Sequence, residues 1–276
     1  MVMNKIKRGF DLARLIKNWP GLFISTLNKK RKLFELELRN GLKFRMRTGY
    51  SSDHNIFREV FIEKIYTPDN LPLNGGTVID VGAHIGFFSI MAAQKANAVI
   101  AVEPTDSNGK LLEDNIRLNN KKNITLVRKA LGKGKGKRKM YINKTAYHTG
   151  LHSFYKNIAS QEFEKDLEEV ETTTIGIDQL FEDYNIKNCE FLKMDCEGAE
   201  YDILLNASDK TLGKIKKIAI STHDVEKYNG QVLADFLAKK GFKVWFAPGG
   251  HPLYAKKIAS RFIRRNRKNE MIIDAF

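Results

Sequence analysis

The segment 77–89 constrains the fold of this chain more than any other stretch of its sequence. It reads as an apolar strand that ends in Asp80, a turn bounded by Gly82 and Gly86, and the apolar start of a helix. A second apolar run follows and ends in Glu103. If the two strands lie side by side, Glu103 is placed to accept hydrogen bonds from a ribose diol. The segment therefore predicts a cleft for a cofactor that contains a nucleoside.

The spacing of the two glycines separates two classes of cofactor. A dinucleotide fingerprint reads G-x-G-x-x-G, but here Ala83, His84 and Ile85 stand between the glycines and the middle glycine is missing. Asp80 also places a negative charge where a pyrophosphate would be repelled. S-adenosylmethionine fits both facts, because it has an adenosine and two cationic groups but no phosphate. On this segment alone, a tight turn in an unrelated α/β protein is an open alternative.

A second motif places several carboxylates directly after another short apolar strand. Asp195, Glu197 and Glu200 fall within six residues. Ligands of open α/β sheets bind at the carboxyl ends of the strands, so these side chains are expected at the same edge as Asp80 and Glu103.

Together, the motifs D-V-G-A-H-I-G (80–86), V-E-P (102–104) and D-C-E-G-A-E (195–200) resemble the FkbM family of S-adenosylmethionine-dependent methyltransferases. The resemblance covers roughly residues 33 to 250. It implies an α/β, Rossmann-like class I methyltransferase fold, with a mostly parallel sheet, helices on both faces and a last antiparallel strand, here Met271–Phe276. It also implies that the cofactor contacts Asp80, Gly82, His84, Gly86, Glu103, Ala130 and Asp195. His84 departs from the family pattern, which commonly has asparagine there.

Alternating apolar runs divide the chain into a leader and one domain. Residues 1–32 are expected to form a basic amphipathic helical leader, which Pro20 ends or kinks. Residues 33–276 would form the methyltransferase domain. Within it we expect a hairpin and helix cap over 33–76, a cofactor-binding core over 77–250 with an insertion at about 137–174, and a basic segment with the last strand over 251–276.

The insertion offers side chains for an acceptor substrate. Tyr147, His148 and His152 are candidates, because segments inserted over strand ends often form part of a site. A surface loop without such a role fits the same sequence.

Methyl transfer to a hydroxyl requires a base near the donor methyl group. His223 follows a predicted strand at the same sheet edge as Asp195, and imidazole titrates near neutral pH, so His223 and Asp195 are the predicted catalytic residues. Glu197, His148 and Asp224 are predicted to contact the substrate. In an alternative arrangement, Asp195, Glu197 and Asp224 hold a divalent cation such as Mg²⁺.

Charge bears on the binding partners. The chain has 47 Lys and Arg against 32 Asp and Glu, a formal net charge of +15, with basic blocks at 5–32, 128–139 and 256–268. Such blocks attract nucleic acid, phospholipid headgroups or a diphosphate-linked glycan, although solvated protein surfaces carry similar charges. The leader could also lie in a membrane interface or pack on its own domain.

The sequence thus predicts an O-methyltransferase that acts on a sugar or a lipid-linked glycan precursor. An RNA methyltransferase and a non-catalytic binding module are the alternatives. Two cysteines, no apolar run of membrane-spanning length and no evident signal peptide predict a cytoplasmic protein, peripheral on a membrane if the leader binds there.

Overall fold

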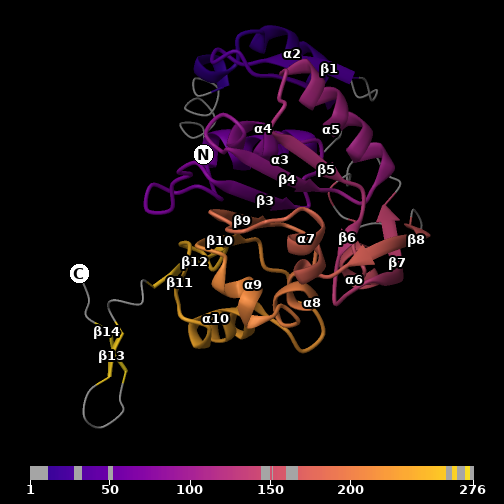
Figure 1. Ribbon diagram of the computed structural model, residues 1–276. Helices are drawn as coiled ribbons and strands as arrows, with labels where there is room; N and C mark the ends of the chain where they lie inside the picture. The colour runs from indigo at the N-terminus through magenta and orange to yellow at the C-terminus, as the bar shows by residue number, and fades with distance from the viewer. Residues whose placement is uncertain are drawn as a thin grey trace.

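A sheet of seven strands forms the centre of the molecule (Figure 1). The computed structural model describes residues 12–27, 33–48, 52–143, 150, 152–159, 167–258, 263–265 and 271–273. The order across the sheet is β11-β12-β10-β9-β3-β4-β5. In sequence order these strands are β3 (Thr77–Val81), β4 (Ala98–Val102), β5 (Ile124–Val127), β9 (Phe191–Met194), β10 (Lys217–Ile220), β11 (Phe242–Phe246) and β12 (Leu253–Lys257).

The sheet has the predicted mostly parallel pattern, with one antiparallel strand. β5, β4, β3, β9 and β10 pair in parallel, and β12 runs antiparallel to both β10 and β11. The predicted class I methyltransferase fold is therefore confirmed.

The identity of the antiparallel strand was predicted wrongly. Met271–Ile273 (β14) pairs with Ile263–Arg265 (β13) in a separate hairpin, which lies apart from the main body in Figure 1. The position beside β10 belongs to β12, whose residues Leu253 to Ala255 are buried. A short connection containing Gly249 and Gly250 joins β11 to β12, and such a connection favours an antiparallel hairpin.

Helices cover both faces of the sheet (Figure 1). One face carries α3 (Asp53–Arg58), the π-helix η1 (Glu59–Glu63), α4 (Phe87–Ala92) and α5 (Asp106–Leu118). The other carries α7 (Ile177–Asp183), α8 (Glu200–Leu204), α9 (Asp209–Gly213) and α10 (Gly230–Lys239).

Alternation along the strands supplies the two hydrophobic cores. Val78 and Val99 belong to one buried cluster, while the next residues, Ile79 and Ile100, belong to the other. Side chains alternate between the faces of a strand, so a strand buried on both faces is apolar at nearly every position.

The leader folds back on a hairpin. Residues 12–15 are helical, Ile16 bridges to Leu38, and a new helix, α2 (Trp19–Leu27), follows. The first helical segment thus ends before Pro20, which lies in the first turn of α2, where proline is tolerated. The predicted hairpin is present as β1 (Leu33–Glu37) and β2 (Lys43–Arg47).

The insertion forms a second, smaller sheet beside the strand ends. Its strands are β6 (Ala130–Leu131), β7 (Gly136–Asn143) and β8 (Leu167–Ile175), and the short helix α6 (Lys156–Ala159) lies between β7 and β8. Two of the proposed acceptor contacts, Tyr147 and His148, lie outside the described residues.

Candidate active site

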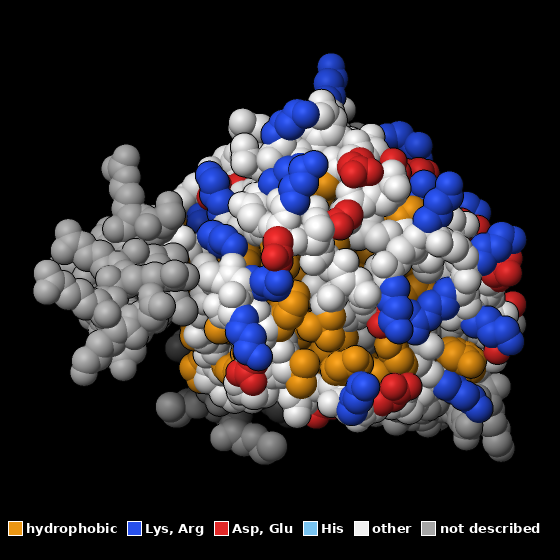
Figure 2. Space-filling model, turned by 60° about the horizontal axis from the view of Figure 1, so that its bottom comes forward, with side chains coloured by type: hydrophobic (Ala, Val, Ile, Leu, Met, Phe, Trp, Pro, Cys, Tyr) orange, Lys and Arg blue, Asp and Glu red, His pale blue; other side chains and the backbone are white. Residues whose placement is uncertain are grey.

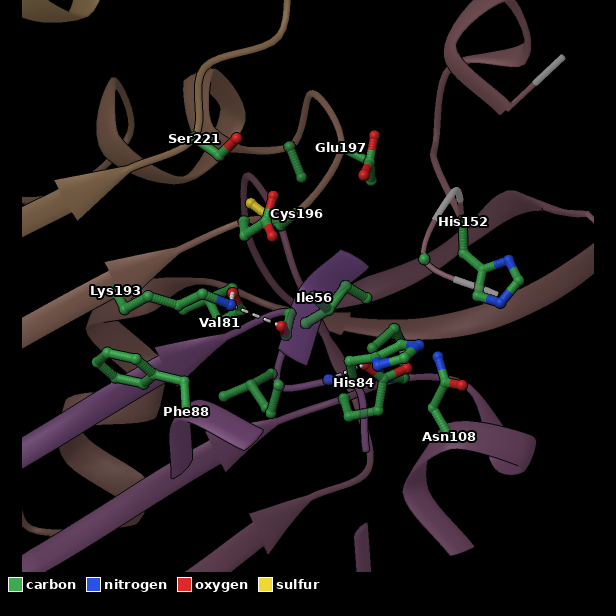
Figure 3. A pocket seen from close by; sticks show the side chains of 18 of the residues that line it. Ile56, Val81, His84, Phe88, Asn108, His152, Lys193, Cys196, Glu197 and Ser221 are labelled. Carbon is green, nitrogen blue, oxygen red and sulfur yellow. Dashed lines mark hydrogen bonds between the residues drawn. The ribbon is translucent and has the colours of Figure 1, made fainter. Parts of the chain in front are cut away.

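A cavity of about 300 Å³ opens at the carboxyl ends of the central strands (Figure 3). Its walls come from the residues that follow β3, β4, β9 and β10, from α3 and η1, and from the insertion. β4 and β5 lie on one side of β3 in the sheet, and β9 and β10 lie on the other. The strand order therefore reverses at β3, and ligands of open α/β sheets bind at such a switch point.

Most of the predicted site residues line this cavity. They are Gly82, His84, Glu103, Ala130, Asp195, Glu197 and His223, and His152 joins them from the insertion. Asp80, Gly86 and Asp224 are not among the lining residues. Asp224 is exposed to solvent, and His148 lies outside the described residues.

The two turn glycines are required by close approaches of the chain. Gly82 has φ +74°, and a Cβ there would lie 1.8 Å from the carbonyl oxygen of Asp195. Gly86 has φ +94°, and its Cβ would lie 2.2 Å from a methyl carbon of Leu112. A side chain at either position would therefore push β9 or α5 away from the turn.

Asp80 has a different neighbour from the one the sequence suggested. It is fully buried, accepts a hydrogen bond of 2.6 Å from Ser89 and lies 3.0 Å from Nζ of Lys193. Lys193 also donates to the carbonyl oxygen of Gly82 at 2.8 Å. The charge of Asp80 is thus compensated inside the protein. We had expected Asp80 to make the cavity attractive to a cation, but it cannot do so by itself.

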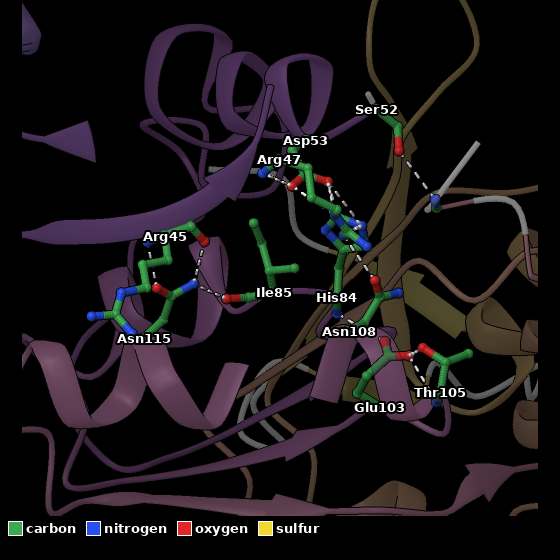
Figure 4. Close-up of polar contacts among 11 residues, drawn as sticks. Arg45, Arg47, Ser52, Asp53, His84, Ile85, Glu103, Thr105, Asn108 and Asn115 are labelled. Carbon is green, nitrogen blue, oxygen red and sulfur yellow. Dashed lines mark hydrogen bonds and ion pairs between the residues drawn. The ribbon is translucent and has the colours of Figure 1, made fainter. Parts of the chain in front are cut away.

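Glu103 is held in a fixed orientation at the cavity wall (Figure 4). One carboxyl oxygen accepts the backbone N–H of His84 at 2.9 Å, and the other accepts the N–H and the hydroxyl of Thr105 at 3.0 and 2.6 Å. Burial raises the pKa of Glu103. Asn108 also hydrogen-bonds to this carboxyl, so a ribose hydroxyl would share or replace one of these donors.

His84 is part of a buried polar network (Figure 4). Arg47 forms an ion pair with Asp53 at 2.9 Å, donates to Asn108 at 2.8 Å, and lies 3.1 Å from Nε2 of His84. Burial lowers the pKa of His84 to about 3, so the ring is neutral. Because Arg47 can only donate, Nε2 of His84 accepts and Nδ1 carries the proton. His84 also has φ +52°, a conformation that asparagine and histidine adopt more readily than most residues.

Glu197, Glu200 and His223 form a group that we call the acid–base cluster. Glu200 is fully buried, and one of its oxygens accepts the backbone N–H of His223 at 2.8 Å and lies 3.0 Å from ring Nδ1. Its other oxygen accepts the N–H of Gly198 at 2.9 Å. Nε2 of His223 lies 3.4 Å from Glu197. The ring is therefore oriented from behind by Glu200, while Nε2 points toward Glu197.

Burial and neighbouring charges shift the titration of this cluster. Burial alone would lower the pKa of His223, but the carboxylates of Glu197 and Glu200 outweigh it and raise that pKa to about 10. Burial raises the pKa of Glu197 to about 8. His223 and Glu197 interact, so their protons belong to the pair rather than to either residue. The ordinary imidazole titration expected for His223 from the sequence does not hold in this environment.

Asp195 completes the polar wall next to the cluster. Its carboxylate accepts a hydrogen bond of 2.8 Å from the hydroxyl of Tyr66. Ligand atoms of Asp195, Glu197 and His223 all lie within 4.8 Å of one another, so these three residues could hold a divalent cation. The predicted metal set had Asp224 in place of His223. An imidazole with two carboxylates suits a transition metal better than Mg²⁺, which prefers oxygen ligands.

Sequence reasoning missed several lining or supporting residues. These are Tyr66, Glu59 and Lys193, which line the cavity. Glu59 lies on the π-helix, where burial raises its pKa to about 7. A π-helical turn has no reliable sequence signal. Glu200, which the sequence analysis expected at this sheet edge, supports the cavity from behind through His223.

Comparisons with known proteins bear on the family of this chain. The chain is 25% identical over 215 residues to the 31-O-demethyl-FK506 methyltransferase FkbM of Streptomyces tacrolimicus, with 68% of this chain and 81% of that protein covered. It is 25% identical over 225 residues to the AMB antimetabolite synthetase AmbE of Pseudomonas aeruginosa, again with 68% of this chain covered. The match spans only 10% of the length of AmbE. A solved structure of a methyltransferase FkbM from Methylobacillus flagellatus covers 71% of this chain and 50% of its own, at 16% identity and a TM-score of 0.44.

A family model described as the methyltransferase FkbM domain matches residues 80–244. This range begins at Asp80 in β3, contains the acid–base cluster, and ends in β11. Because the matched range is more than half of the sequence, the chain belongs to the FkbM methyltransferase family.

Proposed function

We propose that this chain transfers the methyl group of S-adenosylmethionine to a hydroxyl of a sugar or glycan precursor. The observation that carries the proposal is the acid–base cluster facing the same cavity as Glu103. Such an arrangement supplies a nucleoside site and a proton acceptor within one pocket. The name of the Streptomyces relative specifies an O-demethyl substrate, which supports an oxygen acceptor.

The cofactor would bind over the turn between β3 and α4. Glu103 would accept the ribose hydroxyls, and the turn that begins at Gly82 would form the floor beneath the cofactor. The carboxylate of Asp195, held by Tyr66, lies at the same edge and would attract the cationic methionine end. Positioning donor and acceptor about 3 to 3.5 Å apart can contribute on the order of 7 to 11 kcal/mol to the rate.

The acceptor hydroxyl would lose its proton to the acid–base cluster. Nε2 of His223 lies 3.4 Å from the carboxyl of Glu197, so a hydroxyl bound beside this pair would be within reach of both groups. At neutral pH the cluster already holds protons, since the pKa values of Glu197 and His223 are about 8 and about 10. The proposed mechanism therefore requires a rate of methyl transfer that rises with pH above neutrality.

A divalent cation held by Asp195, Glu197 and His223 is the second form of this proposal. In that form His223 is a ligand rather than a base, and the cation lowers the pKa of the acceptor hydroxyl. Activity that EDTA abolishes and Mn²⁺ or Mg²⁺ restores would establish the metal-dependent form. Activity that EDTA leaves unchanged would assign the proton to the cluster.

The test of the proposal has two stages. Calorimetry should show binding of S-adenosylmethionine to the wild type and at least about tenfold weaker binding to Glu103→Ala, because ribose hydrogen bonds to a charged group are lost. Glu182→Ala, an exposed residue of α7, serves as the control. An absence of binding to the wild type would favour a non-catalytic module.

The second stage measures transfer of labelled methyl groups to lipid-linked sugars and, separately, to RNA. Label in the sugar fraction, lost in His223→Gln, is expected. Label in RNA would replace the proposed substrate class. The charge gives limited support to RNA, because Figure 2 shows Lys and Arg side chains interspersed with Asp and Glu over the face in view.

A further inference from the structure

Helix α2 and the start of β1 carry an apolar surface that faces solvent. Among the described residues, the exposed large hydrophobic side chains are Trp19 at 44%, Phe23 at 60%, Ile24 at 67% and Leu33 at 62%. We call these four residues the apolar patch. All of them belong to α2 or β1, so exposed apolar side chains gather at one place instead of being scattered singly, as is normal on a protein surface.

Packing of α2 against the hairpin fixes this orientation. Leu22 is buried on the inner side of the helix, and Gly21 lies close enough to the ring of Phe34 that a Cβ would be 3.4 Å from it. The side chain of Asn18 donates to the carbonyl of Glu35 and accepts the N–H of Glu37. The helix is thus anchored on one side, and the apolar patch cannot turn inward without breaking these contacts.

The segment of sequence that carries the apolar patch is basic. Residues 12–34 contain six Lys or Arg and no Asp or Glu. Four of the six, Lys29, Lys30, Arg31 and Lys32, lie in the sequence directly between α2 and β1. Lys17, just before α2, has a side chain that is 60% exposed although it pairs with Glu37.

We propose that the apolar patch, together with the basic residues that flank it in the sequence, binds the surface of a bilayer that contains anionic phospholipids. Trp and Phe favour the depth of the headgroups, where an apolar ring can be buried, and nearby Lys and Arg attract anionic lipids. The contact is peripheral, since within the described ranges no helix has both the length and the apolar character needed to cross a bilayer. This inference does not depend on the methyl transfer proposed above.

Trp19 provides a direct reporter of the contact. The chain has two tryptophans, and Trp245 is partly buried against Tyr254 at a ring distance of 5.6 Å, so Trp245→Phe leaves Trp19 as the sole emitter. Added to vesicles of phosphatidylglycerol and phosphatidylcholine, this variant should show a blue-shifted emission that brominated lipids quench. Unchanged emission with these vesicles would overturn the proposal.

Two sets of variants separate the apolar from the electrostatic contribution. Phe23→Ser combined with Ile24→Ser should weaken vesicle binding at least about tenfold, because two side chains no longer enter the lipid. Both residues are exposed, so an unchanged melting temperature should confirm that the variant is folded. Binding equal to the wild type would contradict the inference.

Neutralising Lys29, Lys30 and Lys32 to Gln should weaken binding to anionic vesicles and reduce its salt dependence. The matched control neutralises Lys133, Lys135 and Lys137, which removes the same charge from the connection between β6 and β7 and from the start of β7. Equal losses in the two triple variants would point to net charge alone and refute a local site. If the wild type instead dimerises without vesicles and the serine variant does not, the apolar patch is a contact between two copies and the bilayer assignment is wrong.

Discussion

Replacing Glu200 by Gln should lower the pKa of His223, and this effect can be measured without knowing the acceptor. The carboxylate lies 3.0 Å from Nδ1 and accepts the backbone N–H of His223 at 2.8 Å. Two unit charges at that distance attract by about 5 kcal/mol at an effective dielectric constant of 20. Glutamine retains an oxygen for the N–H but removes the negative charge.

The expected fall in the pKa of His223 is about 1 to 3, which corresponds to about 1.4 to 4 kcal/mol. This fall is smaller than the full charge–charge attraction would give, because the carboxylates of Glu197 and Asp195 still favour the protonated ring. Loss of an anionic neighbour destabilises the imidazolium, so the sign of the change is downward from about 10.

Nuclear magnetic resonance of the histidine side chains gives the measurement. The chain has only six histidines, and His223→Gln identifies the signal to follow. Glu182→Gln, which removes one exposed negative charge, is the control, and circular dichroism monitors folding at alkaline pH. A wild-type His223 that titrates near 6.5, or a pKa that Glu200→Gln leaves unchanged, would refute the reasoning about the cluster.

Three further predictions concern stability. Gly82→Ala should prevent stable folding because its Cβ would lie 1.8 Å from a carbonyl oxygen, whereas Gly213→Ala, with open space around it, should leave the urea midpoint unchanged or slightly higher. Asp53→Asn should lower the free energy of unfolding by about 3 to 5 kcal/mol, because it breaks a buried ion pair. Asp106→Asn, which breaks a surface ion pair, should lower it by less than about 1 kcal/mol. Similar losses for the two variants in urea titrations would contradict this difference. Finally, the free energy of unfolding should fall from pH 7 to pH 10. The native acid–base cluster holds protons with pKa values of about 8 and about 10, and the unfolded chain releases these protons at lower pH. A free energy of unfolding that stays constant over this range would be inconsistent with those values.

Local patterns in the sequence were sufficient to predict most of the sheet. The apolar strand predicted to end in Asp80 corresponds to β3, the apolar run before Glu103 corresponds to β4, and the predicted hairpin is present as β1 and β2. These features depend on runs of apolar residues and on turn geometry, which neighbouring residues determine. The same reasoning indicated that Glu103 and Asp195 lie at one sheet edge, because parallel strands end on the same side.

Pairing between distant segments could not be read in this way. Both Met271–Ile273 and Leu253–Lys257 are short strands near the end of the chain, and only packing in the folded sheet places the second of them beside β10. Asp80 and Lys193 are partners across β3 and β9, so the compensation of the Asp80 charge follows from the strand order rather than from the sequence around either residue.

The sequence by itself determined the α/β alternation, the glycine turn and the chemical groups available at the strand ends. The tertiary structure decided which of those groups face the cavity and which protonation states they favour. His223 illustrates the difference, because carboxylates supplied by a different segment of the chain raise its pKa and outweigh the opposing effect of burial. Hydrophobic periodicity is a local property of a strand or helix, whereas desolvation and charge interactions depend on distances that exist only after folding.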